Sequence, residues 1–226
     1  MLNLTSRKLS ADRTLPGMES SGRRITDTIP PDLLHRRRAA RRLMVDARHE
    51  RNAVEQIIQL PAAGESLHFI VDGRYEPCDL IPAKSRLSRP ATIKRLEITT
   101  LGVNNDNVSV LANGMDQGKI GQCMVLVSGF FCRAHSPEFE FLRTEIEGRG
   151  GKTHAMGTHA KLILMEMTDG NWYTIEGSGN LRSCQSIEQF VMTNDRDLLL
   201  FHRGWIEDYV FNCSGKDKTT KRTRRQ

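Results

Sequence analysis

The chain has 226 residues, 38% of them apolar and 27% charged, so it can bury one core of ordinary domain size. Its formal net charge is +6, with Lys and Arg concentrated at the two ends, which favours a polyanionic partner such as nucleic acid. No apolar run is long enough to cross a bilayer and no segment resembles a signal peptide, so we expect neither secretion nor a membrane span, and a cytoplasmic location.

The cysteine and histidine pattern does not indicate a metal site. Five cysteines are scattered without a CxxC pair, which argues against a disulfide framework or a zinc knuckle and favours a reducing compartment. They are Cys78, Cys123, Cys132, Cys184 and Cys213. His154 and His159 are close together in HAMGTH, but no Cys or carboxylate completes a zinc ligand set at the usual spacing. We therefore expect no metal and no other cofactor.

The first sixty residues divide into a polar segment and a basic helix. Residues 1–30 are rich in Ser, Thr, Arg, Gly and Pro without a sustained period, which predicts disorder. Residues 31–60 carry an approximate helical stripe of apolar residues, and Asp32 in the first turn suits a helix N-terminus. Five arginines of this helix have the donors to grip phosphates: Arg36, Arg37, Arg38, Arg41 and Arg42. A solvated helix face, or packing on a partner subunit, explains the same arginines equally well.

Residues 61–212 are expected to form one domain of alternating strands and helices. The elements expected in its first half are a hairpin over 66–81 with Asp72 and Gly73 in its turn, a strand over 93–102, a helix beginning near Asn105, a strand over 122–131, and a helix capped by Ser136 and ended by Gly148. In the second half we expect a short strand over 153–156, a second hairpin, a strand over 190–193 and a helix over 195–209. This alternation predicts an α/β layered domain, followed by a basic disordered tail at 213–226.

The second hairpin carries most of the polar chemistry. HAKLILME is typical of a strand on which His159 and Lys161 share one face, because side chains alternate with period two. TDGN then favours a tight turn, and WYTIE returns as the partner strand. It ends in GSGN, whose two glycines let the backbone, Ser178 and Asn180 approach a bound anion. The hairpin is therefore expected to gather an imidazole, an ammonium, a hydroxyl and a carboxamide around one phosphodiester.

The HAK strand followed by GSGN resembles the signature of the phospholipase D superfamily, a His-x-Lys strand and a Gly-Ser-x-Asn turn that Gly177 opens here. The resemblance covers roughly residues 92–210. It implies an α/β/α layered sandwich with a central mixed sheet, one half-domain per chain. It also gives Glu188, in IEQF, the role of the acidic residue that holds the catalytic imidazole. Glu166 stands where the family pattern has an Asp.

The resemblance implies a metal-independent phosphodiesterase that forms a phosphohistidine. Attack on phosphorus and protonation of the leaving oxygen take place on opposite sides, so one histidine cannot perform both in line. The motif occurs once in this chain, whereas family members carry it twice or dimerise, and we therefore expect a homodimer that contributes His159 from each copy. Lys161, Asn180 and Ser178 would bind the non-bridging oxygens. Because the two histidines need opposite protonation states, a bell-shaped pH profile is expected.

The resemblance does not select a substrate, because the superfamily acts on nucleic acids and on phospholipids. The basic ends of the chain favour a nuclease that hydrolyses DNA or RNA. A phospholipid phosphodiesterase is the second hypothesis and requires an apolar acyl groove. The third is a nucleic-acid-binding protein of the same fold without turnover, and the presence of all four motif side chains argues against it.

Overall fold

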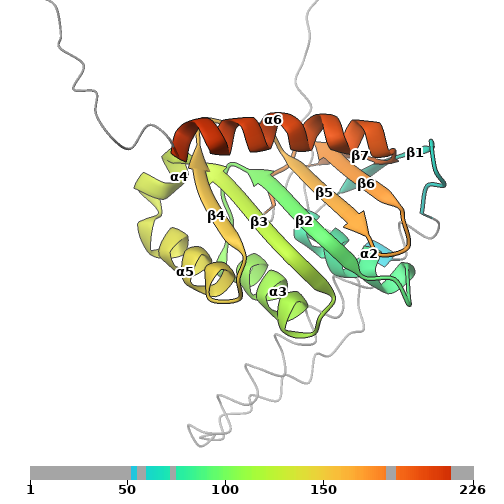
Figure 1. Cartoon of the computed structure of the whole chain (residues 1–226), viewed down its shortest axis with the longest axis horizontal. Coiled ribbons are helices and arrows are strands. Elements are labelled where there is room, and N and C mark those ends of the chain that lie inside the picture. Colours follow the sequence, from blue (N-terminus) through green and yellow to red (C-terminus); the bar gives the residue numbers. More distant parts are fainter. Residues whose placement is uncertain (1–51, 55–59, 72–74, 182–186, 215–226) are drawn as a thin grey trace, which may run out of the picture. The chain divides into compact units, whose positions relative to one another are not determined.

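A computed structural model describes residues 52–54, 60–71, 75–181 and 187–214, which form a seven-stranded sheet with helices on both faces (Figure 1). The strands are β1 (Ser66–Val71), β2 (Ile93–Thr100), β3 (Ile120–Ser128), β4 (Lys152–Met156), β5 (Leu162–Met167), β6 (Trp172–Gly177) and β7 (Glu188–Asn194). The helices are η1 (Pro77–Asp79), α2 (Leu80–Leu87), α3 (Asn105–Asp116), α4 (Gly129–Ala134), α5 (Ser136–Glu147) and α6 (Arg196–Ser214). The five arginines of the predicted basic helix lie outside the described residues, as does the tail from residue 215.

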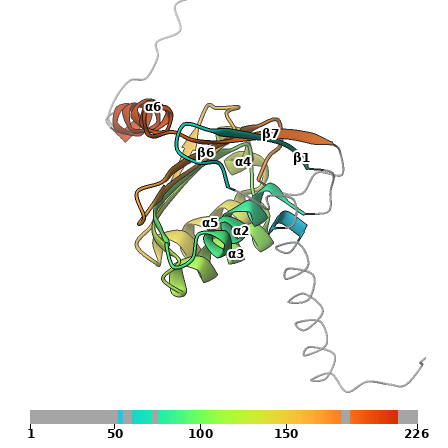
Figure 2. The same cartoon turned by 90° about the vertical axis from the view of Figure 1, so that its right-hand side faces the viewer.

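The sheet is mixed, in the order β1-β7-β6-β5-β2-β3-β4. Strands β2, β3 and β4 are parallel, and their crossovers run through α3 and through α4 with α5. The remaining strand pairs are antiparallel. Helix α6 lies on one face of the sheet, while α2, α3 and α5 lie on the other (Figure 2). The predicted α/β/α arrangement with a central mixed sheet is confirmed.

Both faces of β5 are buried, which explains why its sequence is almost continuously apolar. Ile163 and Met165 belong to the larger core, which includes buried apolar residues of α2, α3 and α5. Leu162 and Leu164 belong to a smaller core with Leu199 of α6. The side chains therefore alternate as the period-two pattern predicts. Within the described residues, no helix has both the length and the hydropathy that a bilayer crossing requires.

The predicted hairpin over 66–81 is wrong in its second half. β1 forms as expected, but it pairs with β7, and the chain then enters η1 and α2. Pro77 explains the difference, because proline cannot donate to a strand ladder but suits the first turn of a helix. Asp79 completes a capping box, in which its carboxylate accepts from the Glu76 amide at 2.6 Å. The expected turn at Asp72 and Gly73 lies outside the described residues.

Two boundaries around β3 and α5 also differ from the prediction. The apolar run over 122–131 does not stay extended to its end: β3 stops at Ser128, whose hydroxyl accepts the Phe131 amide at 3.0 Å and begins α4. Ser136 is the first residue of α5 and not its cap, which is His135. The cause is the direct succession of α4 and α5, which leaves His135 alone between them.

Glu166 belongs to a largely buried ion network under α6. Its carboxylate accepts from Lys94 at 2.6 Å and from Arg203 at 2.9 Å. Arg203 also donates to Glu97, on the neighbouring strand β2, at 2.7 Å. Burial by itself raises the pKa of Glu166, but the hydrogen bonds from Lys94 and Arg203 outweigh it and hold this pKa below its ordinary value. In this chain the residue ties α6 to the sheet.

Lys84 on α2 is fully buried, with 1% of its surface exposed. Its ammonium donates to the Ser88 hydroxyl and lies 3.9 Å from the centroid of the Tyr173 ring. Burial disfavours the charged form and lowers the pKa of Lys84 to about 8. An unfolded chain would hold this proton to a higher pH, so the free energy of unfolding rises with pH between about 8 and the ordinary value of 10.5.

Replacing Lys84 with Met is therefore expected to stabilise the protein at pH 7, because the cost of burying an ammonium disappears. The same variant is expected to lose the gain in stability that the wild type shows between pH 8 and 9.5. Urea unfolding at pH 7, 8 and 9.5 measures both effects. Lys119→Met, which removes a lysine that is only partly buried, controls for a general change in net charge. A Lys84→Met protein that is less stable than the wild type at every pH would contradict the prediction.

Candidate active site

The β5–β6 hairpin brings the two halves of the motif together, as the sequence predicts. Leu162 lies opposite Glu176, so the residues just before β5 and just after β6 meet at the same end of the sheet. The turn between the strands contains Gly170 with a φ of +86°, a backbone conformation that favours glycine. The hairpin therefore forms the frame on which the motif residues are presented.

His159 and Lys161 do not lie on a strand, which corrects the prediction from HAKLILME. β5 begins at Leu162, and both residues belong to the connection between β4 and β5. If the β2–β5 register continued past Leu162, Leu101 would lie opposite Ala160. The ladder instead ends at the Thr99–Leu162 pair, before it reaches the motif, and the Leu101 amide donates to the side chain of Asn180 at 3.3 Å.

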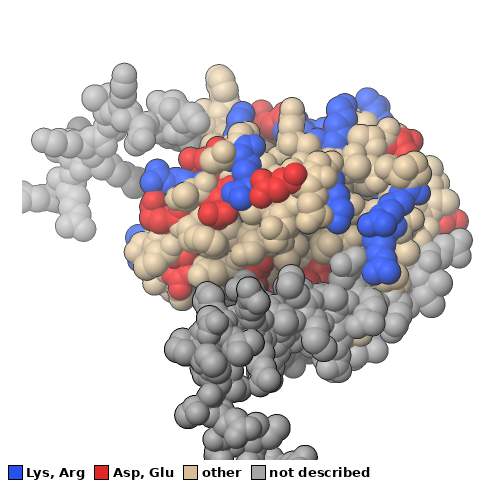
Figure 3. All heavy atoms as spheres, turned by 90° about the horizontal axis from the view of Figure 1, so that it is seen from below, with Lys and Arg blue, Asp and Glu red and all other residues tan. Residues whose placement is uncertain are grey.

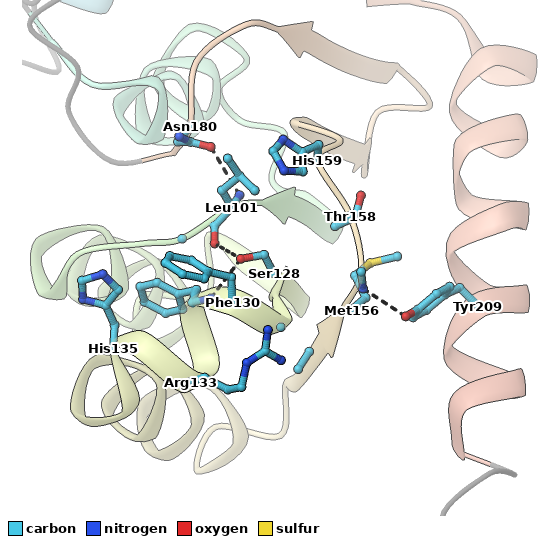
Figure 4. A pocket seen from close by; sticks show the side chains of 15 residues that line it. Leu101, Ser128, Phe130, Arg133, His135, Met156, Thr158, His159, Asn180 and Tyr209 are labelled. Atoms are coloured by element: carbon cyan, nitrogen blue, oxygen red, sulfur yellow. Dashed lines mark hydrogen bonds between the residues drawn. The ribbon is translucent and has the colours of Figure 1, made fainter. Parts of the chain in front are cut away.

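His159 and Asn180 line one cavity of about 560 Å³, although they come from different sides of the hairpin (Figure 4). The volume falls within the range of small-molecule sites. The cavity is lined by Leu101, Gly102, Ser128, Gly129, Phe130, Phe131, Arg133, His135, Ala155, Met156, Gly157, Thr158, His159, Asn180 and Tyr209. The His159 side chain is exposed to it, and no hydrogen bond from the described residues holds the imidazole. This cavity is the candidate site.

The turn that carries Asn180 is anchored to the end of β2. The Leu101 amide donates a hydrogen bond to the carboxamide oxygen of Asn180, and the Leu181 amide donates to the Thr100 hydroxyl at 3.1 Å. Since the oxygen of the carboxamide is occupied, its two N–H donors are left for a bound anion. Asn180 is thus held in a position where it can donate into the cavity.

The loop that carries His159 is held by hydrogen bonds on both sides of this residue. The Gly157 amide donates to the Tyr209 hydroxyl of α6 at 3.1 Å, and the Ala160 amide donates to the Thr158 hydroxyl at 2.9 Å. Lys161 donates from its Nζ to the backbone carbonyl of His159 at 3.0 Å. These hydrogen bonds fix the position of the loop backbone that carries the His159 imidazole.

Lys161, Ser178 and Glu188 do not line the cavity. Lys161 borders a small void of about 10 Å³ together with Gly179. The Ser178 hydroxyl donates to the Glu188 carboxylate and accepts the Gln189 amide at 3.2 Å. Within the described residues Glu188 makes no hydrogen bond to His159, so its assigned part in orienting the imidazole stays a prediction. The structure therefore brings together two of the five predicted catalytic residues in one cavity, and the other three do not line it.

The two glycines of the turn meet an aromatic ring. A side chain at Gly177 would overlap the ring of Phe190 on β7, and a Cβ at Gly179 would lie 2.9 Å from its Cζ. Phe190 in turn stacks on Phe69, with ring centroids 5.9 Å apart. These positions therefore need glycine for packing, whether or not an anion approaches them.

Several lining residues come from parts of the chain that carry no motif. Phe130 and Arg133 lie on α4, His135 follows it, and Tyr209 lies on α6. Figure 4 shows Asn180 and His159 on one side of the cavity, with Phe130 and Arg133 on the other. The only sequence signal near α4 is GFFCRAH, where aromatic and basic residues follow a buried strand. This segment adds cationic and aromatic groups to the site.

On the described part of the face seen in Figure 3, acidic and basic side chains are mixed. His154 lies on β4 outside the cavity lining, and burial, followed by the charge of Lys152, lowers its pKa. Its Nε2 is buried without a hydrogen-bond partner among the described residues. His154 is therefore not part of the candidate site that His159 lines.

No protein-family model and no curated protein sequence matches this chain. Among solved structures, it is similar to a polyphosphate kinase from Porphyromonas gingivalis, with 14% identity and a TM-score of 0.47 over 72% of this chain. It spans 27% of the length of that kinase. It is also similar to Nuc, a phospholipase D family member from Salmonella typhimurium, with 12% identity and a TM-score of 0.46 over 64% of this chain and 94% of that one. Each likeness concerns the fold alone.

Proposed function

We propose that the protein is a metal-independent phosphodiesterase. More specifically, we propose that it is a nuclease that acts on DNA or RNA as a homodimer. The observation that carries the proposal is the shared cavity of His159 and Asn180, which come from the two halves of one motif. A nucleophilic nitrogen and fixed N–H donors in one cavity are the groups that attack on a phosphodiester requires. The resemblance to the phospholipase D signature names the same residues.

In the proposed first step, an imidazole nitrogen of His159 attacks phosphorus, and a phosphorus–nitrogen bond forms as the bond to the leaving oxygen breaks. The protonated His159 of a second copy gives its proton to that oxygen. In the second step water attacks phosphorus, the same second histidine takes a proton from the water, and the phosphorus–nitrogen bond breaks. Both histidines are then in their starting states, and one phosphodiester has become a phosphomonoester and an alcohol.

Asn180 and Lys161 are assigned to the non-bridging oxygens. The Asn180 carboxamide faces the cavity with its oxygen already bound by Leu101, which supports a role as donor. Lys161 follows His159 by two residues in the same loop, and among the described residues its Nζ donates only to a backbone carbonyl. A shift of this flexible side chain on binding would exchange that neutral acceptor for an anionic one, which forms the stronger hydrogen bond.

The test is cleavage in the presence of excess EDTA. The full chain is incubated with plasmid, single-stranded DNA, RNA and phosphatidylcholine vesicles, and products are separated by electrophoresis or thin-layer chromatography. We expect cleavage of nucleic acid that persists in EDTA, together with a dimer in sedimentation velocity. Release of a lipid headgroup alone would instead support the phospholipid phosphodiesterase. Salt-sensitive binding of nucleic acid without products would support a binding protein.

A further inference from the structure

Phe130 is an exposed aromatic residue inside the candidate site. It lies on α4 and lines the same cavity as His159, yet 68% of its surface is exposed. The core does not need its ring, because the next residue, Phe131, is the one that is buried. Phe131 also stacks on His135, with centroids 5.3 Å apart, so the neighbouring aromatic surfaces are already paired. The Phe130 ring is therefore open to a ligand.

We propose that Phe130 stacks on the nucleobase beside the scissile phosphate and that single-stranded nucleic acid is the substrate class. This inference rests on the proposed phosphodiesterase function and names the substrate of the same cavity. An aromatic ring next to phosphate-binding groups is the combination that single-strand-binding sites use, because every base has a face that can stack. A duplex keeps its bases paired and stacked on each other, so only an unpaired strand presents a base to this ring.

Arg133 supplies the cation that a polynucleotide needs at this side of the cavity. It lies one turn of α4 after Phe130, and its Nη1 approaches Gly129, 3.5 Å from the position that a Cβ would take there. Figure 4 shows its side chain extending from α4 into the space between the lining residues, on the side opposite His159. Among the described residues, no carboxylate lies within ion-pairing distance of its guanidinium. Arg133 can therefore bind the phosphate that follows the stacked nucleoside.

The substitution Phe130→Ala tests the proposal on the full-length protein. The probes are a single-stranded DNA oligonucleotide and one of the same length in which the bases are replaced by abasic sites. Cleavage is followed in EDTA, and binding is followed by fluorescence anisotropy. We expect Phe130→Ala to lower kcat/KM and affinity for the normal strand by about 5- to 150-fold and to leave the abasic strand unchanged. Phe130→Tyr keeps the ring and is expected to restore both values.

The matched control is Phe201→Ala. Phe201 lies on α6, is 67% exposed and does not line the cavity, so its loss is expected to change neither the cleavage nor the binding of either strand.

Equal losses on the normal and abasic strands, or none on either, would overturn the stacking proposal, as would a Phe130→Ala protein that changes from dimer to monomer. If the wild type binds the strand without cleaving it, the proposed hydrolysis fails, and the difference in binding between the two strands still decides the role of Phe130. A wild type that binds neither strand overturns the proposed substrate class.

Discussion

The His159→Ala variant is expected to lose phosphodiesterase activity by at least about a thousandfold, because the proposed nucleophile and the proposed acid are the same residue in the two copies of the dimer. Its melting temperature is expected to stay at that of the wild type. The His159 side chain is exposed and makes no hydrogen bond among the described residues, so its removal breaks no contact of the fold. Single-turnover cleavage of a labelled strand and thermal unfolding measure the two effects.

The matched control for this variant is His68→Ala. His68 is also exposed, but it lies on β1, at a different cavity of the same sheet. Its removal is expected to leave the rate unchanged. Retained cleavage in purified His159→Ala protein would rule out the proposed nucleophile, and equal losses in both histidine variants would indicate a general effect on the fold.

The Arg203→Met variant is expected to have the largest effect on stability, a loss of about 3–5 kcal/mol in the free energy of unfolding. Arg203 is 8% exposed and holds Glu97, which is fully buried, and Glu166. Without the guanidinium, the Glu97 carboxylate keeps only its bond to Arg95, at 2.6 Å, and loses a charge partner in the protein interior. Urea denaturation at pH 7 measures the change.

An exposed ion pair provides the comparison for Arg203. Arg143 and Glu140 lie on α5, 2.5 Å apart and both about half exposed, so Arg143→Met is expected to cost less than about 1 kcal/mol. A loss of similar size in the two variants would show that the buried network contributes no more than a surface pair. Restoration of stability by Glu97→Gln in the Arg203→Met background would show that the uncompensated carboxylate is the cause.

Local sequence patterns predicted most of the fold because they depend on neighbouring residues. The near-continuous apolar run of β5 and the Asp-Gly turn after it specify a buried hairpin without reference to the rest of the chain. The failed hairpin at β1 shows the limit, because the partner of that strand is β7, more than a hundred residues later. The residue that argued against a second strand in the sequence was Pro77, because proline cannot donate to a strand ladder.

The site was predictable in part for the same reason. His159 and Asn180 are linked by one hairpin, so their meeting follows from local structure. The strand expected to carry His159 begins only at Leu162, and the Leu101 amide beyond the last strand pair donates to the side chain of Asn180. Phe130 and Tyr209 reach the cavity from α4 and α6, and no period or spacing in the sequence connects them with the motif.

The packing of Phe190 against Gly177 and Gly179 changes what a match to GSGN means. Both glycines of GSGN are required by their packing against the Phe190 ring on β7. Their presence therefore indicates a stable sheet and does not indicate catalytic activity. A chain could keep both glycines and have no activity, whereas the loss of Asn180 would remove a donor and leave the packing of Phe190 against the two glycines intact. When proteins with this signature are sorted into enzymes and non-enzymes, the histidine and the asparagine should therefore be given more weight than the glycines.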